Sequence, residues 1–282
     1  MKTGKMILSI VLSLLALVVA QVLAQLIASI VILINLPAFI GNILAGILYV
    51  VLAYLLLKLL CEKYIKDPMS EYNIPKFKIK LKWGIVAVVL PLAVTVFYLL
   101  FVPGSLEQNA LEVTAKLELL SAGVFFTGFG AGIVEEMVFR GVLMCVIEKR
   151  FNKRIAIIVP SVLFGFVHIM GMDFDLLSCV LVLLAGTMVG IMFSLIASES
   201  NSIWNSAIVH ALWNIIIIGG ILWTGTEFDE YSLCSYVLES KTFLLTGGEF
   251  GIESSIVAVI GYSLVCLFVI LSNRKKNITE IK

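Results

Sequence analysis

Long apolar runs alternate with short polar connections along this chain, and they predict helices that cross a membrane. A crossing helix needs about 17–25 mostly apolar residues, and the runs are of this size or longer. Helix is the expected state, because lipid offers no partner for unpaired backbone groups. The eight predicted spans are residues 6–34, 39–60, 83–103, 119–147, 155–171, 174–197, 202–224 and 253–272.

The pattern is ambiguous at two places, the start of the first run and the boundary between the fifth and sixth spans. The first run begins after Lys2 and Lys5 like a signal peptide, but it continues without a charge to Ile34, about twice the length of a signal core. We therefore expect an uncleaved first membrane helix. The fifth and sixth spans are separated only by the polar break at Gly171–Asp175, where we place their boundary.

Composition agrees with a protein whose surface faces lipid. Hydrophobic residues make up 61% of the chain and charged residues 14%, against about 25% charged residues in soluble domains. We predict an all-α fold, a polytopic transmembrane bundle of about eight spans. The five cysteines are scattered without CxxC spacing, so they predict neither a zinc knuckle nor a disulfide framework.

The distribution of lysine and arginine predicts the orientation of the bundle. With the N-terminus inside, 17 of the 20 basic residues fall in inner segments, two (Lys116 and Lys241) fall in outer ones, and Arg140 lies within a span. Basic residues favour the cytoplasmic side, so we expect a multi-pass cell-membrane protein with both termini in the cytoplasm. The predicted outer loops are acidic, with Glu107, Glu112, Glu118, Asp173, Asp175, Glu227, Asp229 and Glu230.

Five ionisable residues lie deep inside predicted spans. A charge at the centre of a membrane helix costs roughly 2.5–3.5 kcal/mol on insertion scales, so such residues are rare and usually functional. A buried ion pair that holds helices together is the structural alternative, and it suits one pair better than all five residues. The five are Glu135, Glu136, Arg140, His168 and His210, which include both histidines of the chain.

Spacing assigns partners to some of these groups. Glu136 and Arg140 are four residues apart on one helix face and can neutralise each other. Glu135 lies about 100° around the helix and is free to point at another helix. His210 and Asn214 also share a face. Glu135, His168 and His210 lie nine to fourteen residues from the predicted cytoplasmic ends, roughly 14–21 Å deep, near mid-membrane.

These residue types suit hydrolysis of a carbonyl compound, including a peptide bond. A carboxylate can take a proton from water while a histidine orients that water, and amide or imidazole N–H groups can stabilise an oxyanion. Glu135, His168 and His210 would also serve as ligands of Zn²⁺. The residues leave both possibilities open, and we favour a site without a tightly bound metal.

Three motifs resemble a known family of membrane proteases. Residues 135–140 match EExxxR, residues 164–168 match FxxxH, and residues 210–214 match HxxxN, in this order on successive spans. Together they are similar to the CPBP family of CAAX-protease and bacteriocin-processing (Abi-type) membrane endopeptidases. The resemblance implies that Glu135 activates water with help from His168. It also implies that His210 and Asn214 stabilise the oxyanion and that Glu136 and Arg140 support the site.

The resemblance divides the chain into three parts. Residues 1–118 would form three N-terminal spans, residues 119–218 a CAAX-protease-like catalytic core, and residues 219–282 an outer loop, the last span and a cytoplasmic tail. The expected partners are the lipid bilayer and a membrane-associated protein or peptide substrate, and not nucleic acid. Prenylated CAAX proteins and bacteriocin-linked peptides are both open as substrates.

Two other functions remain as alternatives. Glu, His and Arg in membranes also form the relays of proton-coupled transporters. Such transporters usually carry internal repeats, and no second copy of the glutamate-bearing span is visible. A catalytically idle immunity or scaffold protein could retain the same motifs, although the intact set of motif residues argues against decay.

Overall fold

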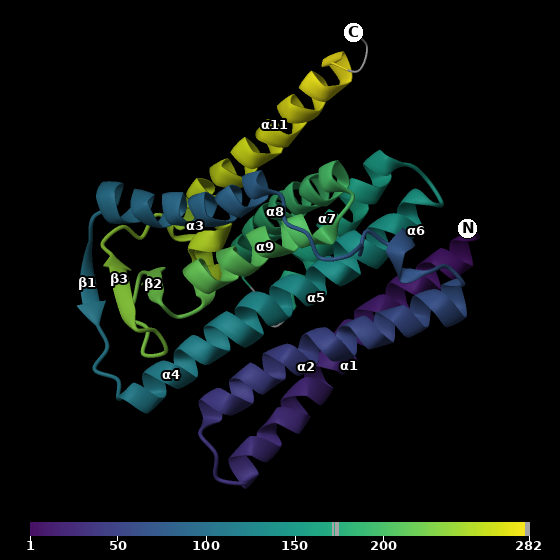
Figure 1. Ribbon diagram of the computed structural model, residues 1–282. Helices are drawn as coiled ribbons and strands as arrows, with labels where there is room; N and C mark the ends of the chain where they lie inside the picture. The colour runs from purple at the N-terminus through teal and green to yellow at the C-terminus, as the bar shows by residue number, and fades with distance from the viewer. Residues whose placement is uncertain (171, 173–174, 280–282) are drawn as a thin grey trace.

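Long helices dominate the computed structural model, which describes residues 1–170, 172 and 175–279 (Figure 1). Within these residues, six helices are long and apolar enough to cross a membrane. They are α1 (Thr3–Leu33), α2 (Ala38–Leu59) with its continuation to Ile65, α3 (Leu81–Phe101), the long helix Val113–Glu148, α8 (Leu176–Ser200), and the Ile256–Asn273 part of α11 (Ile256–Thr279).

Two further helices are shorter than a full crossing. They are α7 (Lys153–Ile169) and α9 (Ile203–Trp213), which a π-helical turn extends to Ile218. Each of the eight predicted runs contains a helix, which confirms the polytopic helical bundle. The prediction for 202–224 was wrong at its end, where the chain leaves the helix and enters a strand. Of the predicted boundary at Gly171–Asp175, residues 171, 173 and 174 lie outside the described residues.

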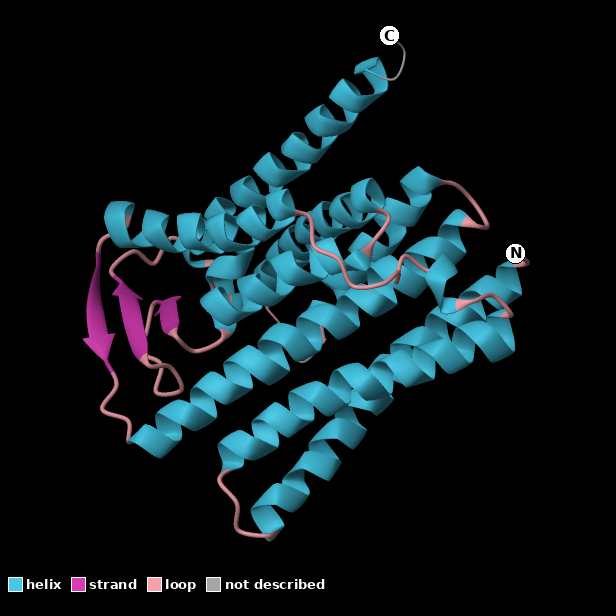
Figure 2. Ribbon diagram, in the orientation of Figure 1, coloured by secondary structure: helices cyan, strands magenta, loops and turns pink. Residues whose placement is uncertain are grey.

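A three-stranded sheet covers one end of the bundle (Figure 2). Strand β3 (Cys234–Leu238) is central, antiparallel to β1 (Gly104–Gln108) and parallel to β2 (Leu222–Gly225). The sheet joins the connection after α3 to the segment that follows α9. A membrane-hydropathy pattern carries no signal for such short strands, so the sequence did not predict them. The four-residue helix α10 (Phe243–Thr246) follows the sheet.

Small residues let α1 and α2 pack closely as a hairpin. The buried face of α1 consists mainly of serine and alanine, whereas its exposed residues are large and apolar, as suits contact with lipid. On α2, a Cβ at Gly46 would lie 2.2 Å from the backbone oxygen of Phe125. Only glycine permits this approach, so the hairpin rests directly on the long helix that carries the two glutamates.

The long helix Val113–Glu148 runs through the middle of the bundle as α4 (Val113–Ser121), α5 (Gly132–Glu136) and α6 (Met144–Glu148), joined by π-helical turns (Figure 1). Gly132 meets the backbone of Ala211 on α9, and Gly186 of α8 meets Gly165 of α7. These close contacts fix the distances between the helices that carry the motif residues.

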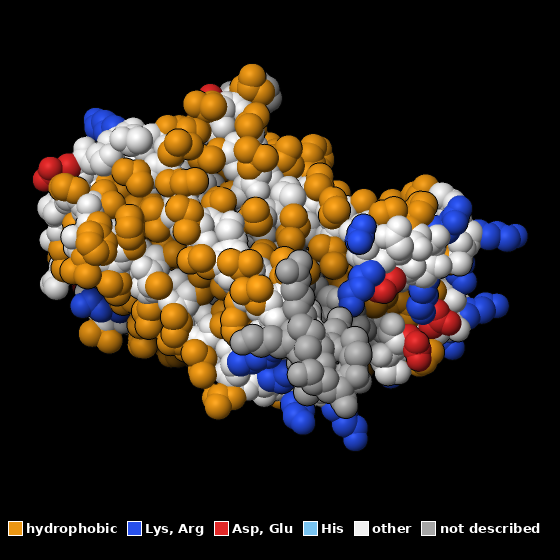
Figure 3. All heavy atoms as spheres, turned by 90° about the horizontal axis from the view of Figure 1, so that it is seen from above, with side chains coloured by type: hydrophobic (Ala, Val, Ile, Leu, Met, Phe, Trp, Pro, Cys, Tyr) orange, Lys and Arg blue, Asp and Glu red, His pale blue; other side chains and the backbone are white. Residues whose placement is uncertain are grey.

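The surface is apolar around its middle and basic toward one end. Hydrophobic side chains cover most of the face in Figure 3, and many lysine and arginine side chains gather toward the end that holds the N-terminus. At that end the connection between α2 and α3 is tied to the bundle. Lys149 Nζ lies 2.8 Å from Asp67 Oδ2 and lowers the pKa of this carboxyl, as does the hydroxyl of Tyr72 at 3.0 Å.

Candidate active site

The two glutamates lie on α5, a short α-helical segment between two π-helical stretches. These are Ala122–Ala131 before it and Met137–Leu143 after it. A π-helical turn shifts the backbone hydrogen-bonding pattern, and such turns are frequent at functional sites. Gly130 and Gly132, in and after the first stretch, fit tight contacts with α2 and α9, and Gly141 in the second stretch lies against the connection between α2 and α3.

Glu136 and Arg140 form the predicted ion pair. Arg140 Nη1 donates to Glu136 Oε1 at 2.7 Å, and both side chains are fully buried. Nη2 of the same guanidinium donates to the backbone oxygen of Gly190 on α8 at 3.1 Å. The pair therefore connects the glutamate-bearing helix to α8 as well as balancing its own charges.

Phenylalanine rings enclose the arginine. The guanidinium carbon of Arg140 lies 4.5 Å from the ring centre of Phe164 and 5.1 Å from that of Phe193. Aromatic faces attract a cation, and they exclude water from it. The Phe164 ring also contacts the ring of His168, with centroids 4.4 Å apart. The phenylalanine of the FxxxH motif thus separates the buried cation from a histidine.

His210 lies between the two glutamates. Its Nδ1 is 3.2 Å from Glu136 Oε1, and its Nε2 is 3.7 Å from Glu135 Oε2. The imidazole stacks on Phe193, with centroids 4.6 Å apart and an interplanar angle of 17°. Glu135 therefore does point at another helix, as its position around the helix predicts, and the histidine in contact with it is His210 on α9.

His168 presents one ring nitrogen to the site. Its Nδ1 lies 2.7 Å from the backbone oxygen of Phe164. A carbonyl only accepts hydrogen bonds, so Nδ1 carries the proton. In the neutral ring Nε2 then has a free lone pair, which can accept a hydrogen bond or a proton.

Asn214 is held by the glutamate-bearing helix. Its Nδ2 donates to the backbone oxygen of Thr127 at 2.9 Å. Thr127 belongs to the first π-helical stretch. This bond fixes the orientation of the amide, and an amide nitrogen has a second hydrogen to donate.

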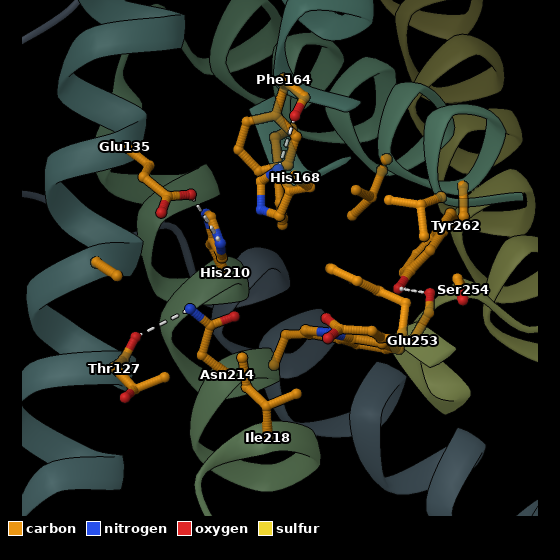
Figure 4. A pocket seen from close by; sticks show the side chains of 18 residues that line it. Thr127, Glu135, Phe164, His168, His210, Asn214, Ile218, Glu253, Ser254 and Tyr262 are labelled. Atoms are coloured by element: carbon orange, nitrogen blue, oxygen red, sulfur yellow. Dashed lines mark hydrogen bonds and ion pairs between the residues drawn. The ribbon is translucent and has the colours of Figure 1, made fainter. Parts of the chain in front are cut away.

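Four of the predicted residues open onto one cavity of about 200 Å³. Figure 4 shows Glu135, His168, His210 and Asn214 directed into it from three helices. A second cavity of about 650 Å³ reaches Glu135 and His168 past apolar side chains of α1 and α7. Glu136 and Arg140 lie behind the first cavity and support its wall.

Comparison with protein families identifies this part of the chain. Residues 117–216 match the family described as type II CAAX prenyl endopeptidase, Rce1-like. These residues are similar to a CAAX prenyl endopeptidase domain, and this similarity points to an intramembrane protease. Comparisons with curated proteins and with solved structures gave no significant match.

The family match does not account for every residue around the cavity. Phe193 lies inside the matched region but belongs to no motif, and nothing in the sequence distinguishes it from other apolar residues of its span. Glu253 lies outside the matched region, 43 residues after His210 in the sequence, and it also lines the cavity. Its place at the start of the last predicted span was the only sequence signal that could have singled it out.

The possible zinc ligands Glu135, His168 and His210 are not gathered around a single point in the described part of the structure. Within the part of the chain that the structure describes, no three histidine, cysteine, aspartate or glutamate side chains are spaced to hold a metal ion. Glu135, His168 and His210 share the cavity without forming such a group.

Proposed function

We propose that this protein is an intramembrane endopeptidase that hydrolyses a peptide bond of a membrane-associated protein or peptide. The observation that carries the proposal is the single cavity lined by Glu135, His168, His210 and Asn214 within the region similar to a CAAX endopeptidase domain. The second, apolar cavity supports a membrane-associated substrate, because it leads to Glu135 and His168 past residues such as Leu14 and Leu17.

In this proposal Glu135 and His168 activate one water molecule. The Glu135 carboxylate accepts one proton of the water, and Nε2 of His168 accepts a hydrogen bond from the other O–H. The water oxygen then attacks the carbonyl carbon of the scissile bond. A positioned base of this kind commonly accelerates a reaction by about 10²–10⁴-fold.

Asn214 and His210 would stabilise the oxyanion that this attack creates. The Asn214 amide has one hydrogen left after its bond to Thr127. His210 holds Nδ1 toward Glu136, and its Nε2 faces Glu135 at 3.7 Å. In this proposal Nε2 of His210 carries a proton that it donates to the oxyanion, while Glu135 remains the carboxylate that accepts the water proton. The C–N bond then breaks, and the proton taken up by Glu135 passes to the leaving amine.

Reconstituted protein provides the test. Proteoliposomes are incubated in H₂¹⁸O with two sets of membrane-anchored peptides, one prenylated at a C-terminal CAAX sequence and one anchored by an apolar segment. Endopeptidase activity predicts two fragments, of which the new carboxyl terminus carries one ¹⁸O. Fragments that form equally with Glu135→Gln protein would contradict Glu135 as the base, and the transporter or idle-scaffold alternatives predict no labelled fragment at all.

A further inference from the structure

A second glutamate, Glu253, lines the cavity from the wall opposite Glu135 (Figure 4). It lies in the short 3-10 turn Ile252–Ser254 that precedes α11. Glu253 is outside residues 117–216, so the family match assigns no role to it. Its partly buried side chain reaches the same space as Glu135, His168 and Asn214.

The backbone around Glu253 is held firmly. The hydroxyl of Tyr262 donates to the Glu253 backbone oxygen at 3.0 Å, and Ser254 Oγ donates to the backbone oxygen of Gly247 at 2.6 Å. Gly247 and Gly251 have φ angles of 81° and 86°, which suit glycine and let the turn fold back on itself. These bonds hold the backbone that carries the Glu253 side chain at the cavity wall.

Among the described residues that line the cavity, no lysine or arginine balances this carboxylate. Arg140 is already paired with Glu136 and bonded to Gly190. The indole N–H of Trp213 hydrogen-bonds to the Glu253 side chain, but a neutral donor does not cancel a full charge. A carboxylate in an apolar site inside a membrane is costly unless a cation or a proton meets it.

The surroundings of Glu253 would suit a cation. The rings of Trp213 and Tyr262 pack with centroids 5.0 Å apart, and Phe250 lines the same cavity. Aromatic faces attract cations, most strongly where water is excluded. At about 30 Å³ per water molecule, a cavity of about 200 Å³ has the volume of roughly seven waters, enough for one long side chain beside a peptide bond.

We infer that Glu253 and the aromatic rings beside it form a substrate subsite for a positively charged group. That group would be a lysine or arginine side chain near the scissile bond, or the free α-amino group of a short peptide. The inference rests on the proposed endopeptidase function. It assigns to Glu253 the selection of substrate, while Glu135 and its partners carry out hydrolysis.

The test compares peptides that differ by one charge. At each of three positions on either side of the scissile bond, an anchored peptide carries lysine or the uncharged norleucine, with a free or an acetylated N-terminus. Wild-type protein should favour one charged member by about 30-fold or more in kcat/KM, because leaving one member of a buried charge pair unpaired costs about 2–5 kcal/mol. Glu253→Gln should reduce this ratio to near one. The position or terminus at which the preference occurs separates a side chain from an α-amino group.

Glu249→Gln is the matched control, since it makes the same change four residues earlier at an exposed position outside this cavity. It should keep the wild-type ratio. An unchanged ratio of kcat/KM values in Glu253→Gln would overturn the subsite. An equal loss of kcat/KM on charged and uncharged peptides would also overturn it, because that result would indicate a role in catalysis.

Binding separates failure of the subsite from failure of the proposed function. Affinities of the same peptides are measured in nanodiscs with Glu135→Gln protein and with the Glu135→Gln, Glu253→Gln double variant. A preference for the charged peptide that the second change removes supports the subsite even if the wild type cleaves nothing. If Glu135→Gln protein binds the charged and the uncharged peptide with equal affinity, the subsite is overturned even if the wild type cleaves peptides.

Discussion

Nδ1 of His210 lies 3.2 Å from Oε1 of Glu136, the same oxygen that accepts the Arg140 guanidinium at 2.7 Å. One buried carboxylate oxygen therefore serves both a permanent cation and an imidazole. Glu136 neutralises Arg140 and at the same time sets the orientation of His210, whose Nε2 faces Glu135. The spacing of EExxxR explains the first role, and only the fold brings α9 close enough for the second.

The main effect of Glu136→Gln should be a loss of folding stability rather than a direct loss of hydrolytic rate. The change leaves Arg140 charged and fully buried without its partner, which costs about 3–5 kcal/mol for a buried pair. We expect a lower melting temperature in detergent and a reduced yield of folded protein. A matched change at the exposed Glu249, to glutamine, should leave the melting temperature unchanged.

The double variant Glu136→Met, Arg140→Met sharpens this prediction. Replacing both members of a buried ion pair by hydrophobic residues of similar volume is often neutral, so stability should return toward the wild-type value. Hydrolysis should stay low, because His210 still lacks the carboxylate that orients it. A double variant as unstable as the single one would contradict the assignment of the ion pair as the cause.

The contact between Gly132 and α9 leads to a prediction about geometry. A Cβ at Gly132 would lie 2.9 Å from the backbone of Ala211, one residue after His210. Gly132→Ala should push α5 away from α9 and lengthen the contact between Glu135 and His210. A displacement of about 1 Å can cost about 100-fold in rate, and overpacking typically costs about 1–3 kcal/mol.

Gly84→Ala provides the control for this glycine. Gly84 lies in α3, and a Cβ there meets nothing within 4 Å. Alanine is a better helix former than glycine by about 1 kcal/mol, so stability should be equal or higher and activity unchanged. Equal effects of the two substitutions on kcat/KM would show that the Gly132 contact does not position the site.

Asn214→Ala should slow hydrolysis without unfolding the protein. The substitution removes the proposed oxyanion donor and its bond to the Thr127 backbone oxygen, and loss of one such donor costs about 10²–10³-fold in kcat. The effect should appear in kcat rather than in KM, since the oxyanion exists only after attack. A loss confined to KM would assign Asn214 to substrate binding.

The sequence predicts features that depend on residues close together in the chain, and it misses those that depend on packing between distant segments. Helix positions followed from apolar runs, and the Glu136–Arg140 pair followed from a spacing of four on one helix. Phe193 and Glu253 reach the site only through the packing of α8 and α11, and a linear pattern has no signal for such contacts. The sheet was missed because its strands are only four or five residues long: β1 and β3 lie in connections that hydropathy treats as polar loops, and β2 lies at the end of an apolar run.

The sidedness predicted from lysine and arginine is tested by reporter fusions. Fusions after Ser240, which follows β3, and at the C-terminus should report opposite sides of the membrane, outside and inside respectively. The physical reason is the excess of basic residues in the predicted inner segments. Reports of the same side from both fusions would contradict the eight-span model, because the last span lies between the two fusion points.

The measurement that tests the central claim most directly is peptide hydrolysis by Glu135→Gln in proteoliposomes, with melting temperature measured alongside. Glutamine keeps the shape of the side chain but cannot accept a proton from water. The proposed role of Glu135 as the base predicts a loss of about 10²–10⁴-fold in rate at an unchanged melting temperature. Wild-type activity in this variant would contradict the account, because the water would then be activated by some other group.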